Sequence, residues 1–232
     1  MGNISGNAYA LTILSPIKDG YTADEVAYAD VVRDRLQEWN SEPNSPMALV
    51  PQTYLCRYFV LDDVYTESYP GGNAPDTASD WLPLVSDSLR RAALPQEDHL
   101  KSRYLVFSSN FYGGPKGDLN GYLRGMWHAI SDRIKEVWGF CYGFEGVDTA
   151  DKFIAYMKKC QLQTSLFFVG STDDPLEEQL KSLYLKQELS KFAVANQGLD
   201  AATLKANFQA FMRRVEPRNL SAPTWTAGQY RL

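Results

Sequence analysis

The chain has 232 residues, and 44% of them are hydrophobic, which is enough to fill the core of one elaborated domain. Its 28 acidic and 23 basic residues give a formal net charge of -5, whereas a protein that binds a phosphate backbone presents a basic surface. We therefore expect a single domain over residues 1–232 that does not bind nucleic acid.

The cysteines and the hydropathy pattern indicate the compartment. Cys56, Cys141 and Cys160 have no CxxC spacing, so neither a disulfide framework nor a thiolate zinc site is predicted. No stretch reaches the roughly 20 apolar residues that a membrane-spanning helix needs. These features predict a cytoplasmic protein with reduced cysteines and no membrane partner.

The first part of the chain predicts a strand, a helix and a second strand. Residues 10–17 are aliphatic and β-branched and end in turn chemistry. Thr22, followed by Glu25, has the spacing of a capping box and predicts a helix that continues to Trp39. Residues 52–63 are dense in aromatic and β-branched side chains and predict a central strand.

A long insertion follows the second strand. Residues 64–101 are rich in Gly, Pro, Ser, Asp and Glu, and only residues 81–93 suit a short helix. Insertions of this length in a compact domain are often lids or covers. We expect this one to cover a face of the sheet.

The pattern of strands and helices then continues. Residues 103–111 predict a third strand, residues 149–161 a helix with Asp148 as its N-cap, and residues 164–170 a fourth strand. Between the third strand and that helix lies a longer helix with one continuous apolar face, formed by Leu119, Leu123, Met126, Trp127, Ile130, Ile134, Val137 and Trp138.

This order of elements predicts an α+β fold. Residues 8–170 have the order of a ferredoxin-like βαβ-βαβ core, a four-stranded antiparallel sheet with helices on one face. Two additional helices are predicted within residues 171–215, followed by an extended tail over residues 216–232 that packs on a neighbour. The other face of the sheet needs a cover, either the two C-terminal helices or a second copy of the sheet in a homodimer.

Arg57 is the first candidate site residue. Alternation along the second strand places it on one face with Leu55 and Phe59. A guanidinium group among apolar neighbours can bind a carboxylate ligand or stabilise developing negative charge. The alternative is an intramolecular ion pair with Asp62, Asp63 or Glu67.

Three further residues are candidates. Ser108 and Asn110 end the third strand before the glycine-rich loop YGGPKGD, where polar groups and backbone N–H groups could bind an anion, although ordinary turn chemistry is the alternative. His128 lies on the long helix beside its apolar face. It is either a haem ligand or general base, or a histidine at the surface.

Short segments suggest a family. FVLDD at residues 59–63 and LVFSSNFYG at residues 105–113, together with the element order, resemble the dimeric α+β barrel superfamily, which includes dye-decolourising peroxidases and chlorite dismutases. The resemblance implies a homodimer and a haem-dependent, peroxidase-like oxidoreductase, with His128 as proximal ligand and Arg57 as distal group. The GxxDG signature of the dye-decolourising peroxidases is absent from the sequence.

Two functions are therefore considered. The first is a small-molecule enzyme that takes a partly apolar, anionic substrate into a cavity between sheet and helices, either with haem or without a cofactor through Arg57, Ser108 and Asn110. The second is a non-catalytic binding or assembly module. In that case the sheet face and the C-terminal helices contact a second copy or a partner.

Overall fold

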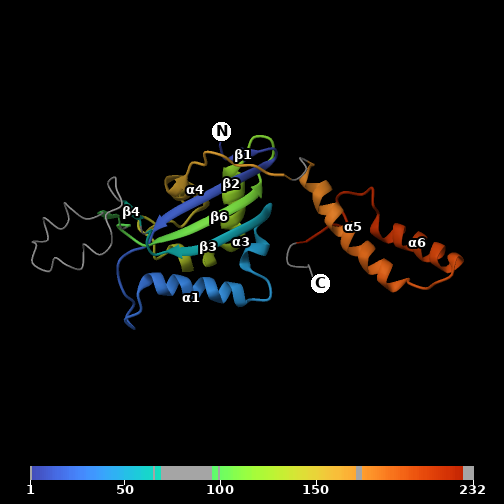
Figure 1. The fold of residues 1–232 in the computed structure, drawn as a ribbon, viewed down its shortest axis with the longest axis horizontal. Helices are drawn as coiled ribbons and strands as arrows, with labels where there is room; N and C mark the ends of the chain where they lie inside the picture. Colours follow the sequence, from blue (N-terminus) through green and yellow to red (C-terminus); the bar gives the residue numbers. More distant parts are fainter. Residues whose placement is uncertain (1, 65, 69–95, 99, 171–173, 227–232) are drawn as a thin grey trace, which may run out of the picture.

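The computed structural model describes residues 2–64, 66–68, 96–98, 100–170 and 174–226. It has the predicted α+β architecture, an antiparallel sheet with helices packed on one side and two further helices towards the C-terminus (Figure 1). The predicted helix at 81–93 and His99 lie outside the described residues. The described ends of the insertion, β4 (Thr66–Ser68) and β5 (Gln96–Asp98), pair with each other.

Three long strands form the sheet, and all three were predicted. In the structure they are β2 (Ala8–Pro16), β3 (Thr53–Leu61) and β6 (Tyr104–Tyr112), with β6 paired antiparallel to both of the others. The prediction that the second strand is central is wrong, because β3 pairs only with β6 among the described strands. Its aromatic and β-branched residues reflect strand propensity, which an edge strand shares with a central one.

The predicted fourth strand at 164–170 is wrong. Only β7 (Gln161–Leu162) pairs with β2, and residues 163–170 form no strand. The short strand β1 (Ile4–Ser5) pairs with the same edge of β2. Beside β1, the Asn3 side chain donates to the Ala10 carbonyl at 2.9 Å and accepts from the Thr164 N–H at 3.3 Å. The Asn3 carboxamide therefore links β2 to Thr164 at a position where the prediction expected backbone hydrogen bonds between two strands.

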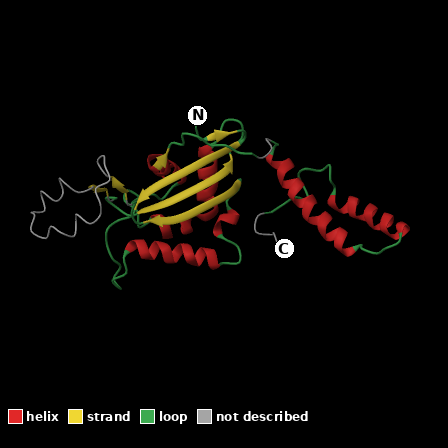
Figure 2. Cartoon of the chain, in the orientation of Figure 1, coloured by secondary structure: helices red, strands yellow, loops and turns green. Residues whose placement is uncertain are grey.

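Helices α1 (Tyr28–Ser41), α3 (Leu119–Trp138) and α4 (Ala150–Cys160) pack on one face of the sheet, with the short 3-10 helix η1 (Pro46–Leu49) after α1 (Figure 2). Thr22 does not cap α1. Its hydroxyl accepts from the Val26 N–H within a turn in which Glu25 has a φ of 60°, and the helix begins at Tyr28.

The N-cap of α4 also differs by one residue from the prediction. Thr149 accepts from the Lys152 N–H at 3.3 Å, whereas the Asp148 carboxylate forms an ion pair with the Lys152 ammonium group at 2.8 Å. Both residues are typical N-caps, so the sequence could not decide between them.

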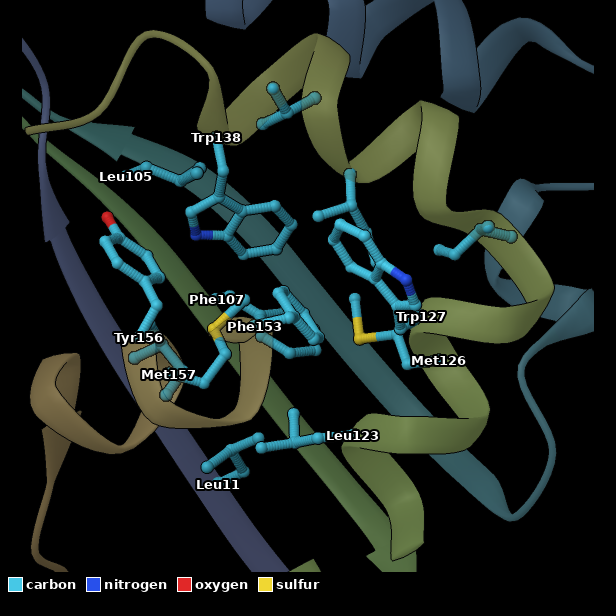
Figure 3. Close-up of a cluster of buried hydrophobic side chains, with 14 of the residues drawn as sticks. Leu11, Leu105, Phe107, Leu123, Met126, Trp127, Trp138, Phe153, Tyr156 and Met157 are labelled. Carbon is cyan, nitrogen blue, oxygen red and sulfur yellow. The ribbon is translucent and has the colours of Figure 1, made fainter. Parts of the chain in front are cut away.

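Aromatic side chains fill the space between the sheet and these helices. Phe107 of β6, Trp138 of α3 and Phe153 of α4 are fully buried (Figure 3). Tyr58 stacks on Phe107 with ring centroids 4.5 Å apart, and the Trp138 indole N–H donates to the Ser15 hydroxyl at 3.2 Å. This bond satisfies the indole N–H of Trp138 within the core, whereas the indole N–H of the buried Trp39 has no partner among the described residues.

The two C-terminal helices, both predicted, are α5 (Leu176–Ala195) and α6 (Ala201–Val215), and they form a hairpin. The buried Lys181 ammonium group donates to the carbonyls of Val215 at 2.7 Å and Pro223 at 2.8 Å. These bonds hold the end of α6 and the described part of the tail on α5. The hairpin lies beside the sheet, and it does not cover the face opposite α1, α3 and α4 (Figure 1).

Within the described residues, no helix is long and apolar enough to cross a membrane.

The core predicts a contrast between a buried and an exposed aromatic ring. Phe107→Ala removes a fully buried ring, and we expect it to lower the free energy of unfolding by about 3–5 kcal/mol. Tyr142→Ala is the control, because this ring after α3 is 48% exposed and its loss should cost roughly 0.5 kcal/mol. Urea denaturation of both variants measures the difference, and equal losses would contradict the packing described.

Candidate functional site

The sheet has one covered face and one open face. Along β3, Cys56 and Tyr58 point to the helices, whereas Leu55, Arg57 and Phe59 are exposed on the other side. None of the helices that the structure describes lies in front of this second side (Figure 2). We call it the open face, and its side chains come from alternate residues of β2, β3 and β6.

Three of the four predicted site residues meet on the open face. The antiparallel register pairs Arg57 with Ser108 and Leu55 with Asn110. Directly paired residues point to the same side of a sheet, with Cβ atoms about 4.5–5.5 Å apart. Arg57, Ser108 and Asn110 therefore form one polar group on two adjacent strands.

Arg57 has no ion pair or hydrogen bond with any described residue. Of the three carboxylates considered as partners, Asp62 binds Arg33 and Arg103, and the Asp63 carboxylate accepts from two backbone N–H groups. The side chain of the third, Glu67, lies outside the described part of the chain. On the three long strands, Arg57 is also the only charged residue whose side chain belongs to the open face. A single cation thus stands among the apolar side chains of Leu55 and Phe59.

The loop after Asn110 does not extend this group. Three of its backbone N–H groups already have carbonyl acceptors, since Gly113 donates to Asn7, Gly117 to Gly114 and Asp118 to Gly113. Arg124, one helical turn into α3, forms an ion pair with Asp151 at 2.6 Å. Both observations favour ordinary turn chemistry for YGGPKGD.

His128 lies away from the other three residues. It is exposed on α3 beside the buried Trp127, and α3 packs on the covered face. The sheet therefore separates His128 from Arg57, and one bound group cannot contact both in a single chain. Among the described residues, no cluster of His, Cys, Asp and Glu side chains could hold a metal ion.

A separate polar pocket of about 260 Å³ lies where β2 leads into α1, with Lys18, Asp19, Tyr28 and Arg103 in its wall. Lys18 forms an ion pair with Glu145 at 2.5 Å, and Arg103 contacts Asp62 at 3.4 Å. The cations of this pocket are thus already paired, whereas Arg57 has no partner among the residues that the structure describes.

One residue of the open face was not among the site residues predicted from the sequence. Thr12 of β2 pairs with Ser108, so Thr12, Ser108 and Arg57 form one row across three strands. Alternation within residues 8–16 gives the face of Thr12, but only the register between strands identifies its neighbours.

Comparison of the chain with protein-family models, with curated proteins and with solved structures finds no match. The open face is therefore interpreted from its own residues.

The reactivity of Cys56, the residue before Arg57, tests whether neighbouring side chains of β3 lie on opposite faces of the sheet. Burial on the covered face raises the pKa of its thiol to about 11. The thiol is protonated below that pH, so we expect alkylation by iodoacetamide at pH 8 to be on the order of 100-fold slower than in the unfolded chain, where thiol pKa values are near 8.5. Peptide mass spectrometry measures the rate at this cysteine, and equal rates in native protein and in urea would place Cys56 on the open side.

Proposed function

We propose that the open face binds a small molecule that carries a carboxylate or polarised carbonyl oxygen on an apolar body. The supporting observation is that Arg57 stands exposed and without a described partner among otherwise uncharged side chains. Its guanidinium group offers five N–H donors in a plane that matches two carboxylate oxygens.

The neighbouring residues supply the rest of the proposed contact. Ser108 lies opposite Arg57, and Asn110 is opposite Leu55, so a hydroxyl and a carboxamide are available to the same oxygen atoms. Leu55 and Phe59 lie on either side of Arg57 and would cover the apolar body of the ligand. For a carbonyl substrate, these donors would polarise the C=O bond without a cofactor.

We do not extend the proposal to haem, because the sheet lies between His128 and Arg57. The ferredoxin-like assignment is kept as an inference about fold. It is supported by the strand order β7-β2-β6-β3, with α1 between β2 and β3, and with α3 and α4 between β6 and β7. A relation to dimeric α+β barrels rests on this order and on the two short segments noted above.

The alternative function is a non-catalytic module that assembles into a homodimer. Large apolar side chains are exposed both on the open face, at Leu55 and Phe59, and on the C-terminal hairpin. Exposed apolar surfaces often form contacts between proteins, so they favour this alternative. The filled core between sheet and helices also favours it.

Arg57→Ala tests the proposed ligand site. We expect the wild-type protein to bind octanoate, used as the probe, with its carboxylate on Arg57, and the variant to bind it at least 10-fold more weakly. Arg57→Lys should retain part of the affinity, because it keeps the charge but loses the planar pair of donors. Isothermal titration calorimetry measures all three dissociation constants.

The matched control is Arg35→Ala, which removes an exposed arginine that pairs with Glu38 on α1. It should leave octanoate affinity unchanged. If octanol binds as tightly as octanoate, or if both alanine variants weaken binding equally, Arg57 is not an anion site.

A further inference from the structure

The start of β3 departs from the alternation of a regular strand. Thr53 and Arg57 are four residues apart and would share a face in an unbroken strand. In the structure the Thr53 hydroxyl bonds to Tyr122 of α3 on the covered side, whereas Arg57 is exposed on the open face. One residue between them is therefore additional to the regular pattern.

The pairing with β6 identifies Tyr54 as this residue. Thr53 and Leu55 pair with consecutive residues of β6, so the intervening Tyr54 is left without a partner on that strand. Such an insertion is a β-bulge, a feature that is frequent beside active sites and that redirects a side chain. Thr53 and Cys56 both point to the helices. Tyr54 and Leu55 lie between them and are 41% and 52% exposed, so the bulge turns two consecutive side chains outward.

The hydroxyl of Tyr122 bridges the two strands at the bulge. It bonds to the Thr53 hydroxyl of β3 at 3.1 Å and to the Ser109 hydroxyl of β6 at 2.8 Å. Tyr122 and Ser109 are fully buried, and one hydroxyl group can donate a hydrogen bond and accept others. The Tyr122 ring stacks on Phe111, with ring centroids 3.8 Å apart. Tyr122 therefore holds Thr53 on the covered side and so keeps the bulge at Tyr54.

A second unusual backbone conformation precedes the bulge. Gln52 has a φ of 68°, in the left-handed region that residues other than glycine seldom adopt, and its carbonyl accepts from the Tyr112 N–H at 2.8 Å. Strained backbone of this kind persists only where its surroundings hold it, and it is common at ligand sites. A strained residue, a hydroxyl bridge and a bulge thus follow one another at Gln52, Thr53 and Tyr54.

The bulge adds an aromatic ring to the open face. Tyr54 comes three residues before Arg57 on β3, and Phe59 comes two residues after it, so a ring lies on each side of the guanidinium group along the strand. The Tyr54 hydroxyl is hydrogen-bonded to Gln179 of α5, which leaves the ring as the part of this side chain that a ligand can use. Aromatic side chains pack favourably on other aromatic rings.

We propose that Tyr54 is a further residue of the ligand site, that Tyr122 is the positioning residue that keeps it there, and that the site takes aromatic carboxylic acids. The carboxylate of the ligand would bind the polar group of β3 and β6, and its ring would pack on Tyr54. The ligand class rests on the proposed function. The role of Tyr122 at the bulge does not depend on a ligand.

Nitration by tetranitromethane tests the bulge without a ligand. Tyr122→Phe removes the hydroxyl bridge but keeps the stacked ring, and it permits regular alternation, in which Tyr54 turns to the covered side. Peptide mass spectrometry should therefore find nitration of Tyr54 about 5-fold slower than in wild type. Thr53→Val removes the same bridge from the side of β3 and should have the same effect. Tyr156→Phe, which removes a hydrogen-bonded hydroxyl from α4, is the matched control and should leave the rate unchanged.

Isothermal titration calorimetry with cinnamate, a flat aromatic carboxylate, tests the ligand class. Tyr54→Ala should bind cinnamate about 5-fold more weakly than wild type, because the stacking ring is lost, whereas Tyr54→Phe keeps the ring and should stay within about 2-fold of wild type. Tyr122→Phe should match Tyr54→Ala, and the double variant should bind no more weakly than either single variant. This non-additivity distinguishes positioning from an independent loss of stability, because independent effects add.

Other outcomes would overturn one part of the proposal or another. Unchanged or faster nitration in Tyr122→Phe, with circular dichroism showing a folded variant, would mean that the hydroxyl bridge does not hold the bulge. If Tyr54→Ala binds cinnamate as tightly as wild type, Tyr54 is not part of the site, although octanoate binding can still depend on Arg57. If wild type binds neither acid, the proposed function is wrong and so is the ligand role of Tyr54, while nitration still decides the role of Tyr122.

Discussion

The backbone register between β3 and β6 determines what each side of this molecule can do. Pairing Tyr58 with Phe107 places their rings together under α3, and the same pairing necessarily places Arg57 beside Ser108 on the opposite side. A shift of one residue would bury the guanidinium group among aromatic rings and expose Tyr58. The hydrophobic core thus fixes the position of Arg57, although Arg57 contributes nothing to that core.

The proposed ligand site and the alternative homodimer both depend on the separation of the sheet into a face covered by helices and an open face. Of the helices that the structure describes, α1, α3 and α4 pack on one side of the sheet, and α5 and α6 are attached beyond its end. A sheet with a single helical layer exposes apolar side chains unless something else covers them. The charge of Arg57, which has no partner among the described residues, then restricts what can cover this face, because an anion or a carboxylate is accommodated there more readily than a second cation.

Much of the fold could be predicted from local patterns. The three long strands and the helices α3, α5 and α6 follow from alternation and helical periodicity, which are properties of short segments. The wrong fourth strand arose where residues distant in sequence supply hydrogen bonds that a local pattern cannot show. Asn3, at the start of the chain, bonds to Thr164, and no pattern within residues 164–170 could reveal that contact.

The candidate site was predictable in part for the same reason. Alternation gave the face of Arg57 relative to Leu55 and Phe59, but the partners across the strands needed the register. Position on a helix also left open whether His128 faced the sheet or solvent, because it lies at the border of the apolar stripe of α3. Its exposure follows from how α3 rotates to bury Trp127.

The Asn3 carboxamide has a consequence for self-association at the edge of the sheet. Residues 164–170 contain strand-forming aromatic and aliphatic side chains, and Leu166 and Phe168 are largely exposed. As a regular edge strand, this segment would offer a row of free N–H and C=O groups to other chains, which is how edge-to-edge aggregation begins. Side chains hold this segment in place of a ladder, because Asn3 bonds to Thr164 and the Ser5 hydroxyl accepts from the Val169 N–H at 3.2 Å. The segment thus stays irregular, and the described sheet ends in a border that is a poor template for further strands.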